Sequence, residues 1–475
     1  MKKHVIICGF VALAAIMPAA CAGPAGPQGI QGEKGEKGET GETGENGEPG
    51  PQGPKGETGE KGDSLFLVIF NTNGGIFPDL NVIKKIAAEE GRPIAAPEDP
   101  FWAWGSFLGW YTQPTGGSLF EFTTPITAPI TLYARWLFDK NLLADWLGNQ
   151  DGGDSEDDAL ILSININLSD WQELLEAIET AQKYVGLDLS LCGINGTVFN
   201  PDSGISAGKD KIVSIVLPKK AVGIAAGISK TTSAFGGFVN LKSFNAANLA
   251  NIGAYAFYGC KKLELTALPS SVSSIGDYAF YECTRLNISA LPAGVTNIGS
   301  YAFYKCTDMT LAEFPSGIVS IDTYAFDGCS KLALTELPGG LTSISNYSFR
   351  NCKSLALAAL PQGITRIGTS AFSGCANLVF TELPSNVSSI LSNAFYNCSG
   401  LTKMTIHEKI TSIGSGAFSG CSSLNLFICM AERPPTLGSD VFYKISDFLI
   451  KVPAASVEAY KTSWSSFAEK IFKIE

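Results

Sequence analysis

Eight cysteines in the C-terminal half of this 475-residue chain recur at a fixed spacing of 23 residues. A phenylalanine stands three residues before each of them and keeps the same period. The cysteines are Cys260, Cys283, Cys306, Cys329, Cys352, Cys375, Cys398 and Cys421. A constant period of this length indicates a solenoid, because each repeat forms one coil and equivalent side chains stack into ladders. A long repetitive surface favours binding over catalysis.

The repeat that starts at Leu263 predicts how one coil is filled. Its inward side chains are expected to be Leu263, Leu265, Leu268, Val272, Ile275 and Phe280. The three leucines are expected to alternate inward along a short strand that ends at Pro269. One coil cannot bury this set by itself, so neighbouring coils must cover it from both sides.

The small number of histidines and the negative net charge exclude several classes of function. The chain has two histidines and a net charge of −11. His4 lies in a segment that is expected to be removed, and His407 alone cannot build a triad or a typical zinc site. We interpret His407 as a surface residue. Nucleic acid is not an expected partner, because phosphate binding needs clustered lysine and arginine. No catalytic, cofactor or metal site is predicted, and the chain is not expected to be an enzyme.

Residues 1–21 are typical of an export signal. A short basic start precedes an apolar run from Val5 to Met17, which is too short to span a membrane. Cys21 follows two alanines and resembles the lipid-attachment cysteine of a bacterial lipobox, although Pro18 stands where leucine is usual. The alternative is ordinary cleavage near Ala22. The protein is therefore expected to be exported, either lipid-anchored at the cell surface or outer membrane through Cys21, or secreted.

Residues 22–63 have glycine at every third position from Gly23 to Gly62. This rule is specific to collagen-like sequence, because only glycine fits at the axis of the triple helix. The tract resembles the collagen-like stalks of bacterial surface proteins. It is expected either to join three chains as a homotrimer or to serve as a flexible hydrated spacer.

Residues 64–137 are expected to form a small α+β domain with several strands and a short helix over Val82 to Glu90. The phrases FNTNGG, FLGWYT and ITLYARW resemble the Listeria–Bacteroides repeat, a β-grasp module of bacterial surface proteins. The resemblance implies a spacer or adhesive role. The domain carries four tryptophans that could stack on carbohydrate, but in so small a domain they are expected to pack in the core: Trp102, Trp104, Trp110 and Trp136.

Residues 138–158 are interpreted as an acidic linker. Asp151 to Asp158 resembles a cation-binding loop in composition, but it lacks the closing glutamate of an EF-hand, so a solvated linker is the preferred interpretation. Residues 159–250 are expected to form an N-terminal cap and atypical first repeats. A helix is expected to open at Ser169, with Gln172 completing a capping box.

Residues 251–430 carry the repeats LPAGVTNIGSYAFYKCTDM and ITSIGSGAFSGCSSL. These resemble BspA-like, or treponemal-type, leucine-rich repeats. Asp322, Ser345 and Leu391 replace the coil glycine, and His407 replaces a proline. Residues 431–475 resemble the closing helical cap of such proteins. The resulting fold class is multidomain: a mainly β solenoid of 23-residue coils, preceded by a β-grasp domain and a collagen-like tract.

The resemblance implies a bacterial cell-surface binding protein, adhesin-like in function. Its expected partners are a host extracellular matrix protein or another bacterial surface protein. The alternative is a structural coat or spacer protein without a specific ligand.

The ladder cysteines are expected to be reduced thiols, because stacked coils place their Cβ atoms about 4.8 Å apart, beyond the usual span of a disulfide. Ligand-binding residues cannot be named from the sequence. Neutral outward side chains form two predicted stripes, which either bind a partner or only keep the coils solvated. The first stripe contains Ser273, Thr296, Thr342, Thr365, Ser388 and Thr411, and the second contains Thr266, Ser289, Thr335 and Thr381.

Overall fold

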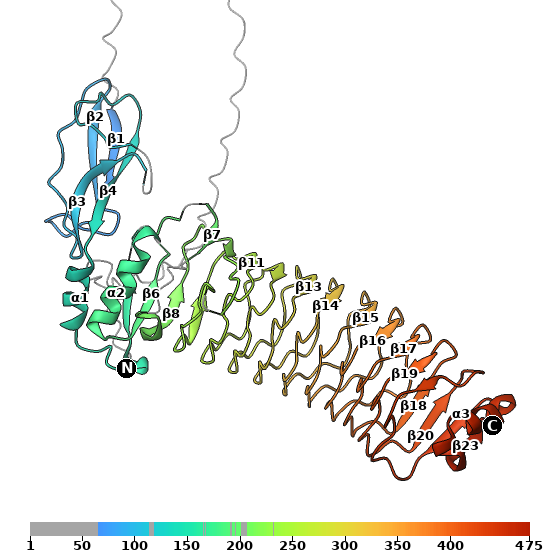
Figure 1. Cartoon of the computed structure of the whole chain (residues 1–475). Helices are drawn as coiled ribbons and strands as arrows, with labels where there is room; N and C mark the ends of the chain where they lie inside the picture. Colours follow the sequence, from blue (N-terminus) through green and yellow to red (C-terminus); the bar gives the residue numbers. More distant parts are fainter. Residues whose placement is uncertain are drawn as a thin grey trace, which may run out of the picture.

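The computed structural model describes residues 65–113, 118–164, 166, 168–190, 192–194, 196–200, 207–230 and 232–475. A small β domain leads into a helical and sheet cap, from which a long stack of coils runs to a second cap at the C-terminus (Figure 1). The predictions for residues 1–64, including the export signal, Cys21 and the collagen-like tract, lie outside the described residues. Within the described ranges, none of the helices has the length and apolar character needed to cross a bilayer.

The N-terminal domain is a four-stranded sheet in the order β2-β1-β4-β3. Its strands are β1 (Leu65–Asn71), β2 (Ile83–Glu89), β3 (Gly105–Tyr111) and β4 (Ile130–Phe138). The central strands β1 and β4 are parallel, and each edge strand is antiparallel to its neighbour. Side chains from one face, including Val68, Phe70 and Leu132, are buried in the core of this domain.

The predicted helix over Val82 to Glu90 is wrong, because this segment is strand β2. All seven of its residues pair with β1, from Ile83 opposite Asn71 to Glu89 opposite Leu65. Lysine, alanine and glutamate favour helix intrinsically, but such preferences are weak compared with tertiary pairing.

The interpretation of residues 138–158 as a linker is also wrong. Helix α1 (Lys140–Gly148) occupies this segment, and Asp139 caps it by accepting a hydrogen bond from the amide of Asn141. Leu143 and Leu147 are buried in the same hydrophobic cluster as the interior of the solenoid. A short 3-10 helix, η1 (Glu156–Asp158), follows. The segment therefore joins the β domain to the solenoid through packed side chains.

The entry cap is a parallel sheet in the order β10-β8-β6-β5, together with helix α2 (Trp171–Ala181). The strands are β5 (Leu160–Ser163), β6 (Val185–Asp188), β8 (Ile212–Val216) and β10 (Ser243–Asn245). The helix buries one apolar face, which contains Trp171, Leu174, Leu175 and Ile178.

The predicted capping box at Ser169 and Gln172 is wrong. A 3-10 turn, η2 (Leu168–Asp170), precedes α2, so that Asp170 is the N-cap residue. The Ser169 hydroxyl donates to the Asp170 carboxylate at 3.0 Å, and the Gln172 amide donates to Glu176 at 3.1 Å. These side chains therefore do not form the hydrogen bonds to backbone amides that a capping box requires.

Each coil of the solenoid contributes a two-residue strand that ends in an inward apolar side chain. These strands pair in parallel with equivalent residues opposite each other, for example Ile252 with Ile275 and Ile367 with Ile390. One sheet has the order β14-β13-β12-β11-β9-β7 and a second has the order β15-β16-β17-β19-β21. Their strands are β7 (Val198–Phe199), β9 (Gly223–Ile224), β11 (Asn251–Ile252), β12 (Ser274–Ile275), β13 (Asn297–Ile298), β14 (Ser320–Ile321), β15 (Ser343–Ile344), β16 (Arg366–Ile367), β17 (Ser389–Ile390), β19 (Ser412–Ile413) and β21 (Thr436–Leu437).

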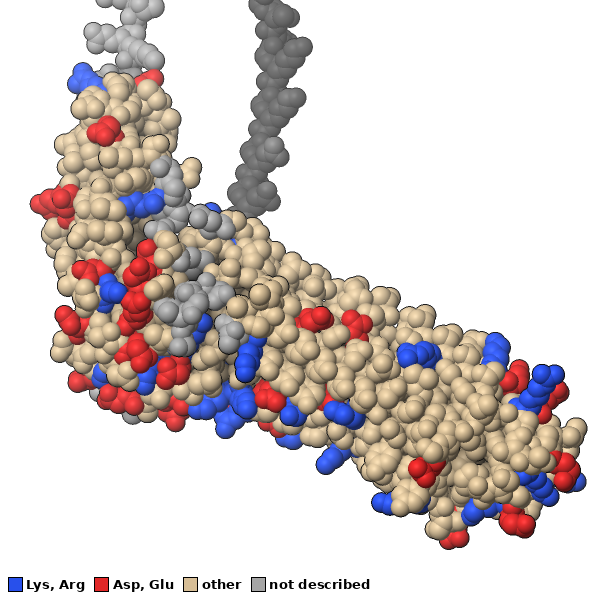
Figure 2. Space-filling model, viewed as in Figure 1, with Lys and Arg blue, Asp and Glu red and all other residues tan. Residues whose placement is uncertain are grey.

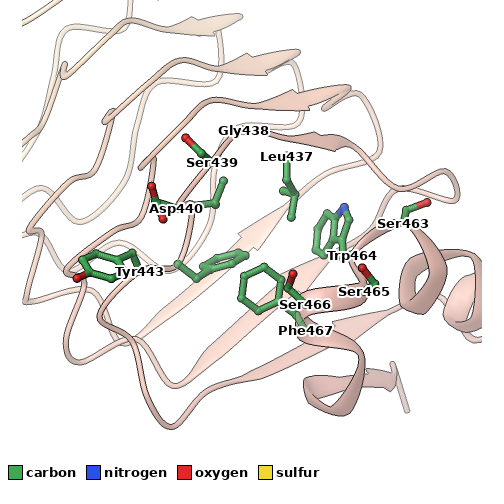
Figure 3. A pocket seen from close by; sticks show the side chains of 12 residues that line it. Leu437, Gly438, Ser439, Asp440, Tyr443, Ser463, Trp464, Ser465, Ser466 and Phe467 are labelled. Carbon is green, nitrogen blue, oxygen red and sulfur yellow. The ribbon is translucent and has the colours of Figure 1, made fainter.

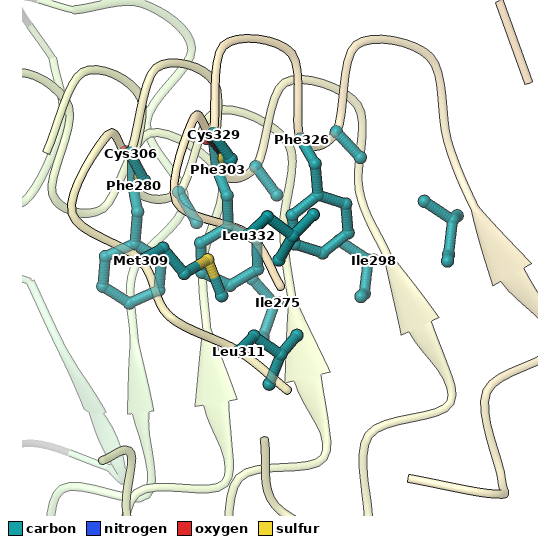
Figure 4. Packing of buried hydrophobic residues seen from close by; sticks show 14 of the residues in the cluster. Ile275, Phe280, Ile298, Phe303, Cys306, Met309, Leu311, Phe326, Cys329 and Leu332 are labelled. Carbon is teal, nitrogen blue, oxygen red and sulfur yellow. Dashed lines mark hydrogen bonds between the residues drawn. The ribbon is translucent and has the colours of Figure 1, made fainter. Parts of the chain in front are cut away.

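The predicted phenylalanine ladder is confirmed. The rings of Phe280, Phe303 and Phe326 are buried and lie nearly parallel, with centroids 5.4 and 5.3 Å apart (Figure 4). Stacked offset rings attract each other in addition to burying apolar area. The ladder runs without a gap from Phe257 to Phe418.

The predicted cysteine ladder is also confirmed, since all eight cysteines are free and buried. From Cys283 to Cys421, each thiol donates a hydrogen bond to the carbonyl of the ladder phenylalanine in the preceding coil, as Cys306 does to Phe280 at 3.1 Å and Cys329 does to Phe303 at 3.0 Å, while Cys260 donates to Phe235. Cysteine thus fills a small apolar space and satisfies a buried backbone acceptor.

The predicted leucine strand is absent from the coil of Leu263, although Leu263, Leu265 and Leu268 are buried there. Among the described residues, strands form at this position at both ends of the stack, as β8 and β10 in the entry cap and as β18 (Lys403–Ile406), β20 (Leu426–Cys429), β22 (Leu449–Val452) and β23 (Ile471–Lys473) in the last coils. The coils between β10 and β18 end the segment with proline, which has no amide to donate to a neighbouring strand. Strand β18 is followed by His407, and Met430 one coil later donates its amide to Ile406.

The closing cap contains α3 (Val457–Ser463) between two 3-10 segments, η4 (Ala454–Ser456) and η5 (Ser465–Lys470). Tyr460 is buried, and its hydroxyl donates to the carbonyl of Ala431 at 2.7 Å. The indole of Trp464 donates to the carbonyl of Pro435 at 2.9 Å. The helical cap expected within residues 431–475 therefore covers the interior of the last coil.

Candidate binding surface

Five tyrosines occupy the same strained backbone position in successive coils. Each lies two residues before a ladder phenylalanine and has a φ angle between 55° and 60°. They are Tyr255, Tyr278, Tyr301, Tyr324 and Tyr347. This left-handed region costs a residue with a bulky side chain about 1 kcal/mol or more, and such strain is a starting point for a functional hypothesis.

Later coils fill the same position with Ser370, whose φ angle is 50°, and then with residues that tolerate the region better. Asn393, Gly416 and Asp440 have φ angles of 56°, 63° and 57°. Glycine has no Cβ to clash, and asparagine and aspartate are enriched in this region. The backbone therefore does not demand tyrosine, and the first five coils use it for another reason.

The five tyrosines stack face to face along the solenoid. Their ring centroids are 4.6, 4.6, 4.4 and 4.3 Å apart in sequence order. A second row, formed by Tyr258, Tyr281 and Tyr304, stacks at 4.6 Å per step. The two rows touch in each shared coil, as Tyr278 and Tyr281 do at 5.8 Å. We call these eight partly exposed residues the tyrosine surface.

Stacking decides which chemistry the tyrosine surface offers. Tyr278, Tyr301 and Tyr324 have a neighbouring ring on both faces, so their faces are not open to a ligand. Sugar rings bind best across an open aromatic face, whereas stacking leaves only the ring edges and hydroxyls of these partly exposed residues to meet a ligand. Ring edges carry partial positive charge and the hydroxyl both donates and accepts. This arrangement suits the carbonyls, side chains and apolar groups of a protein.

A buried ion pair lies at the end of the second row, in the coils that follow Tyr304. Asp327 takes the coil position that follows Tyr304, and its carboxylate is buried. The Arg350 guanidinium of the next coil donates to both oxygens of Asp327, with the closest contact at 2.6 Å. The same guanidinium lies over the rings of Tyr324 and Tyr347 at 5.4 and 5.1 Å. Arginine beside tyrosine is the pairing that protein interfaces favour.

Lysines also border the second row of the tyrosine surface. Lys305 lies 5.0 Å from the ring of Tyr304 and forms an ion pair with Glu282 at 3.1 Å. Lys261 approaches the same glutamate at 3.5 Å. Burial is the main cause that raises the pKa of Tyr278 and Tyr301, and it raises the pKa of Tyr324 to about 12. The phenols are therefore neutral donors at physiological pH.

The sequence contains the signal for this surface, although the prediction did not use it. The motif Tyr-Ala-Phe-Tyr repeats at residues 255–258, 278–281 and 301–304. The prediction names the two neutral Ser/Thr stripes instead. The first of those stripes is exposed as expected, but several hydroxyls donate to the preceding coil, as Thr365 does to the Thr342 carbonyl at 3.2 Å. This bonding within the solenoid favours the interpretation of a solvated face.

The other predicted candidates lie in the β domain and in the turn after β18. Trp102, Trp104 and Trp110 are buried, which confirms core packing rather than carbohydrate stacking. His407 is partly exposed in the turn after β18.

The acidic segment is neutralised by lysines. Glu156 contacts Lys262 at 2.6 Å and Asp157 contacts Lys242 at 2.7 Å. Among the described residues, no group of three or more His, Cys, Asp or Glu side chains is arranged to hold a metal ion.

Two hollows are weaker candidates for a binding site than the tyrosine surface. One of about 450 Å³ lies between the last coil and the closing cap, where Tyr443, Trp464 and Phe467 line it with several serines (Figure 3). Another of about 400 Å³ is bordered by Arg285 and Lys331 with their acidic partners Glu264 and Asp308. In the second, the charges already satisfy one another across neighbouring coils.

Charged side chains are sparse over much of the solenoid face in Figure 2, and they gather near the two ends. Long-range steering of a charged ligand is therefore weak on that face. Contact chemistry, rather than net charge, has to provide recognition.

Three family models match the chain. The BspA type leucine rich repeat region matches residues 228–356 and 342–463, the Listeria-Bacteroides repeat domain matches residues 66–135, and the collagen triple helix repeat matches residues 18–64. No curated protein matches the chain.

Several solved structures are similar to it. A leucine rich cell surface protein from Faecalibacterium prausnitzii is 24% identical, with 56% of this chain and 79% of that chain covered and a TM-score of 0.37. A leucine-rich repeat protein from Bacteroides ovatus is 21% identical, with coverages of 57% and 86% and a TM-score of 0.34. The leucine rich repeat protein of T. pallidum is 23% identical, with coverages of 44% and 77% and a TM-score of 0.24.

Proposed function

Because this chain belongs to the bacterial BspA-type leucine-rich repeat proteins, we propose that it is a cell-surface binding protein that uses its solenoid as an adhesin does. Its partner in this proposal is a protein, either of the host extracellular matrix or of another bacterial surface. The chain reaches the surface through its export signal and is held there by a lipid on Cys21, or else is secreted.

The tyrosine surface is the observation that carries this proposal. Tyrosine gives large contact area at low cost in side-chain entropy, and it is enriched where protein interfaces are strongest. In this solenoid the rings are already ordered by stacking at 4.3 to 4.6 Å, so little freedom remains to be lost on binding. The strained backbone of five of these residues has no structural necessity, because Asn393 and Gly416 replace tyrosine at the same position.

The test measures saturable binding of the exported chain to a panel of matrix and bacterial surface proteins. The variant Tyr278→Asn/Tyr301→Asn removes two central rings, while the backbone angle is kept because Asn393 adopts it naturally. For the partner that binds the unaltered chain, affinity is expected to fall at least about tenfold, since each lost central tyrosine costs about 1 kcal/mol or more.

Tyr396→Asn is the matched control. It occupies the coil position of the second row four coils beyond Tyr304 and is 37% exposed, outside the tyrosine surface. Its affinity is expected to equal that of the unaltered chain. Equal loss in both variants, or none in either, would show that the tyrosine surface does not bind the partner. Absence of binding across the panel would favour the alternative, a coat or spacer protein without a specific ligand.

A further inference from the structure

We propose that the outer face of the β2-β1-β4-β3 sheet is a contact between three copies of this chain. The proposal rests on the homotrimer expected from the collagen-like tract and is independent of the tyrosine surface. Figure 1 shows this sheet at the end of the molecule opposite the C-terminal cap.

Only one face of the sheet is used by the domain core. Along β1 the burial alternates, with Val68 and Phe70 buried and Leu65 and Leu67 on the other side. Leu65 is 65% exposed and Leu67 is 44% exposed. Exposed Ala87 on β2 stands directly opposite Leu67, and partly exposed Ile69 continues the row. We call these four residues the outer apolar face.

Single exposed leucines are common on protein surfaces, but neighbouring apolar groups on adjacent strands point to a contact. Lys85 and Glu89 lie on the same side of β2, opposite Ile69 and Leu65. An apolar centre with a charged border is the usual layout of an interface between proteins. The border also allows Lys85 of one copy to approach Glu89 of another.

The position of the face in the chain identifies the occupant. The last glycine of the collagen-like tract is Gly62, and three residues later the chain enters β1 at Leu65. In a triple helix glycine lies on the common axis, and three residues span at most about 11 Å. Three copies of Leu65 would thus lie within about 22 Å of one another. A triple helix brings the outer apolar faces of its three chains together.

The tract also needs such a contact. It contains five prolines, Pro24, Pro27, Pro49, Pro51 and Pro54, none of them between Pro27 and Pro49. Proline preorganises the extended conformation of each strand, so a proline-poor tract pays more entropy on assembly. A contact at its end holds three chains at high effective concentration and in one register.

The experiment uses the exported chain and measures its mass by sedimentation equilibrium over a concentration series. The unaltered protein is expected to be a trimer. Leu65→Ser/Leu67→Ser is expected to raise the concentration needed for half-assembly at least about tenfold, because two apolar side chains per copy lose their partners. The matched control Leu142→Ser/Leu449→Ser changes two leucines that are each 47% exposed on α1 and β22, and it is expected to assemble normally.

A second measurement does not depend on weakening the fold. Leu67→Cys is expected to form chain-to-chain disulfides under mild oxidation, whereas Leu142→Cys on α1 is not. A trimer whose assembly is unchanged in Leu65→Ser/Leu67→Ser, and which Leu67→Cys does not cross-link, would overturn the contact and leave the homotrimer intact. A monomer at every concentration would overturn both. Neither result would alter binding through the tyrosine surface.

Discussion

At the scale of single residues, the solenoid depends on side chains that serve the neighbouring coil as well as their own. Each ladder cysteine packs as a small apolar group and also donates to the carbonyl of an earlier phenylalanine, which lies 26 residues back for all but Cys260, as for Cys352 and Phe326 at 3.1 Å. Serine could make the same bond, but its hydroxyl is costlier to bury. Burial is the main cause that raises the pKa of every ladder thiol, and that of Cys421 is raised to about 12.

We predict that the eight ladder thiols resist alkylation in the folded protein at about pH 9, where a free cysteine is already largely ionised. A raised folded pKa stabilises the fold fully below the unfolded pKa, and this contribution is lost as pH rises towards the folded value. Mass spectrometry after timed iodoacetamide treatment measures the labelling, with Thr365→Cys as an exposed control. Rapid labelling of the ladder before unfolding would contradict the prediction.

The 23-residue period of the sequence predicts the phenylalanine, isoleucine and cysteine ladders. When every coil has 23 residues, equivalent side chains of successive coils must stack on one another. It does not reveal the left-handed backbone of the tyrosines. That conformation is normally signalled by glycine or asparagine, and Tyr301 or Lys305 gives no such sign although their φ angles are 56° and 54°. Only the stacked geometry shows why tyrosine stands there.

At the scale of elements, the errors share one cause, which is contact with a distant segment. Strand β2 is helix-like in composition, but pairing with β1 decides its structure. The sequence of helix α1 and η1 predicts a linker, because the residues that pack against these elements lie in distant parts of the chain. The ring of Trp104 in the β domain lies 5.4 Å from that of Trp146 in α1, and Glu156 contacts Lys262 in the first regular coil. Local composition carries no information about such partners.

The Glu156 contacts predict a pH-dependent junction. Its hydrogen bond with Lys262 is the main cause that lowers the pKa of Glu156, with help from Lys242. A lowered folded pKa stabilises the fold above the unfolded pKa, and the contribution is lost as pH falls through the folded value. Glu156→Gln is expected to lower the free energy of unfolding by up to about 1 kcal/mol at pH 7 and by almost nothing near pH 3.

Urea denaturation at the two pH values measures this difference. Glu458→Gln is the control, because its ion pair with Lys461 is long, at 3.7 Å, and the glutamate side chain is 88% exposed. It is expected to change stability at neither pH. A pH-independent effect of Glu156→Gln would mean that the junction does not depend on this charge.

At the scale of the whole molecule, the caps determine whether the coil stack remains soluble. The fold class, the order of the domains and the presence of both caps follow from the sequence, because a solenoid with a continuous apolar interior must be closed at each end. The packing that fixes the β domain to the entry cap does not follow, since it uses tryptophans whose partners the sequence leaves open.

We predict that a chain ending at Met430 aggregates, because Phe418 and Phe427 lose the cover of Phe442. Size-exclusion chromatography with light scattering measures the outcome. The matched control removes residues 343–365, one coil from the middle, and joins Thr342 to Arg366 so that Ile367 takes the place of Ile344. It is expected to remain soluble and folded. A soluble chain ending at Met430 would show that the closing cap is dispensable.

Equivalent isoleucines of successive coils pair in register, and this limits how the gene can change in length. The residues are Ile252, Ile275, Ile298 and Ile321. A duplication or loss of 23 codons, or of a multiple of 23, within these regular coils restores every ladder, whereas a change of half a coil leaves one coil out of phase with its neighbours. Replication slippage within the gene can therefore lengthen or shorten the solenoid by one coil at a time, while the two caps remain unchanged.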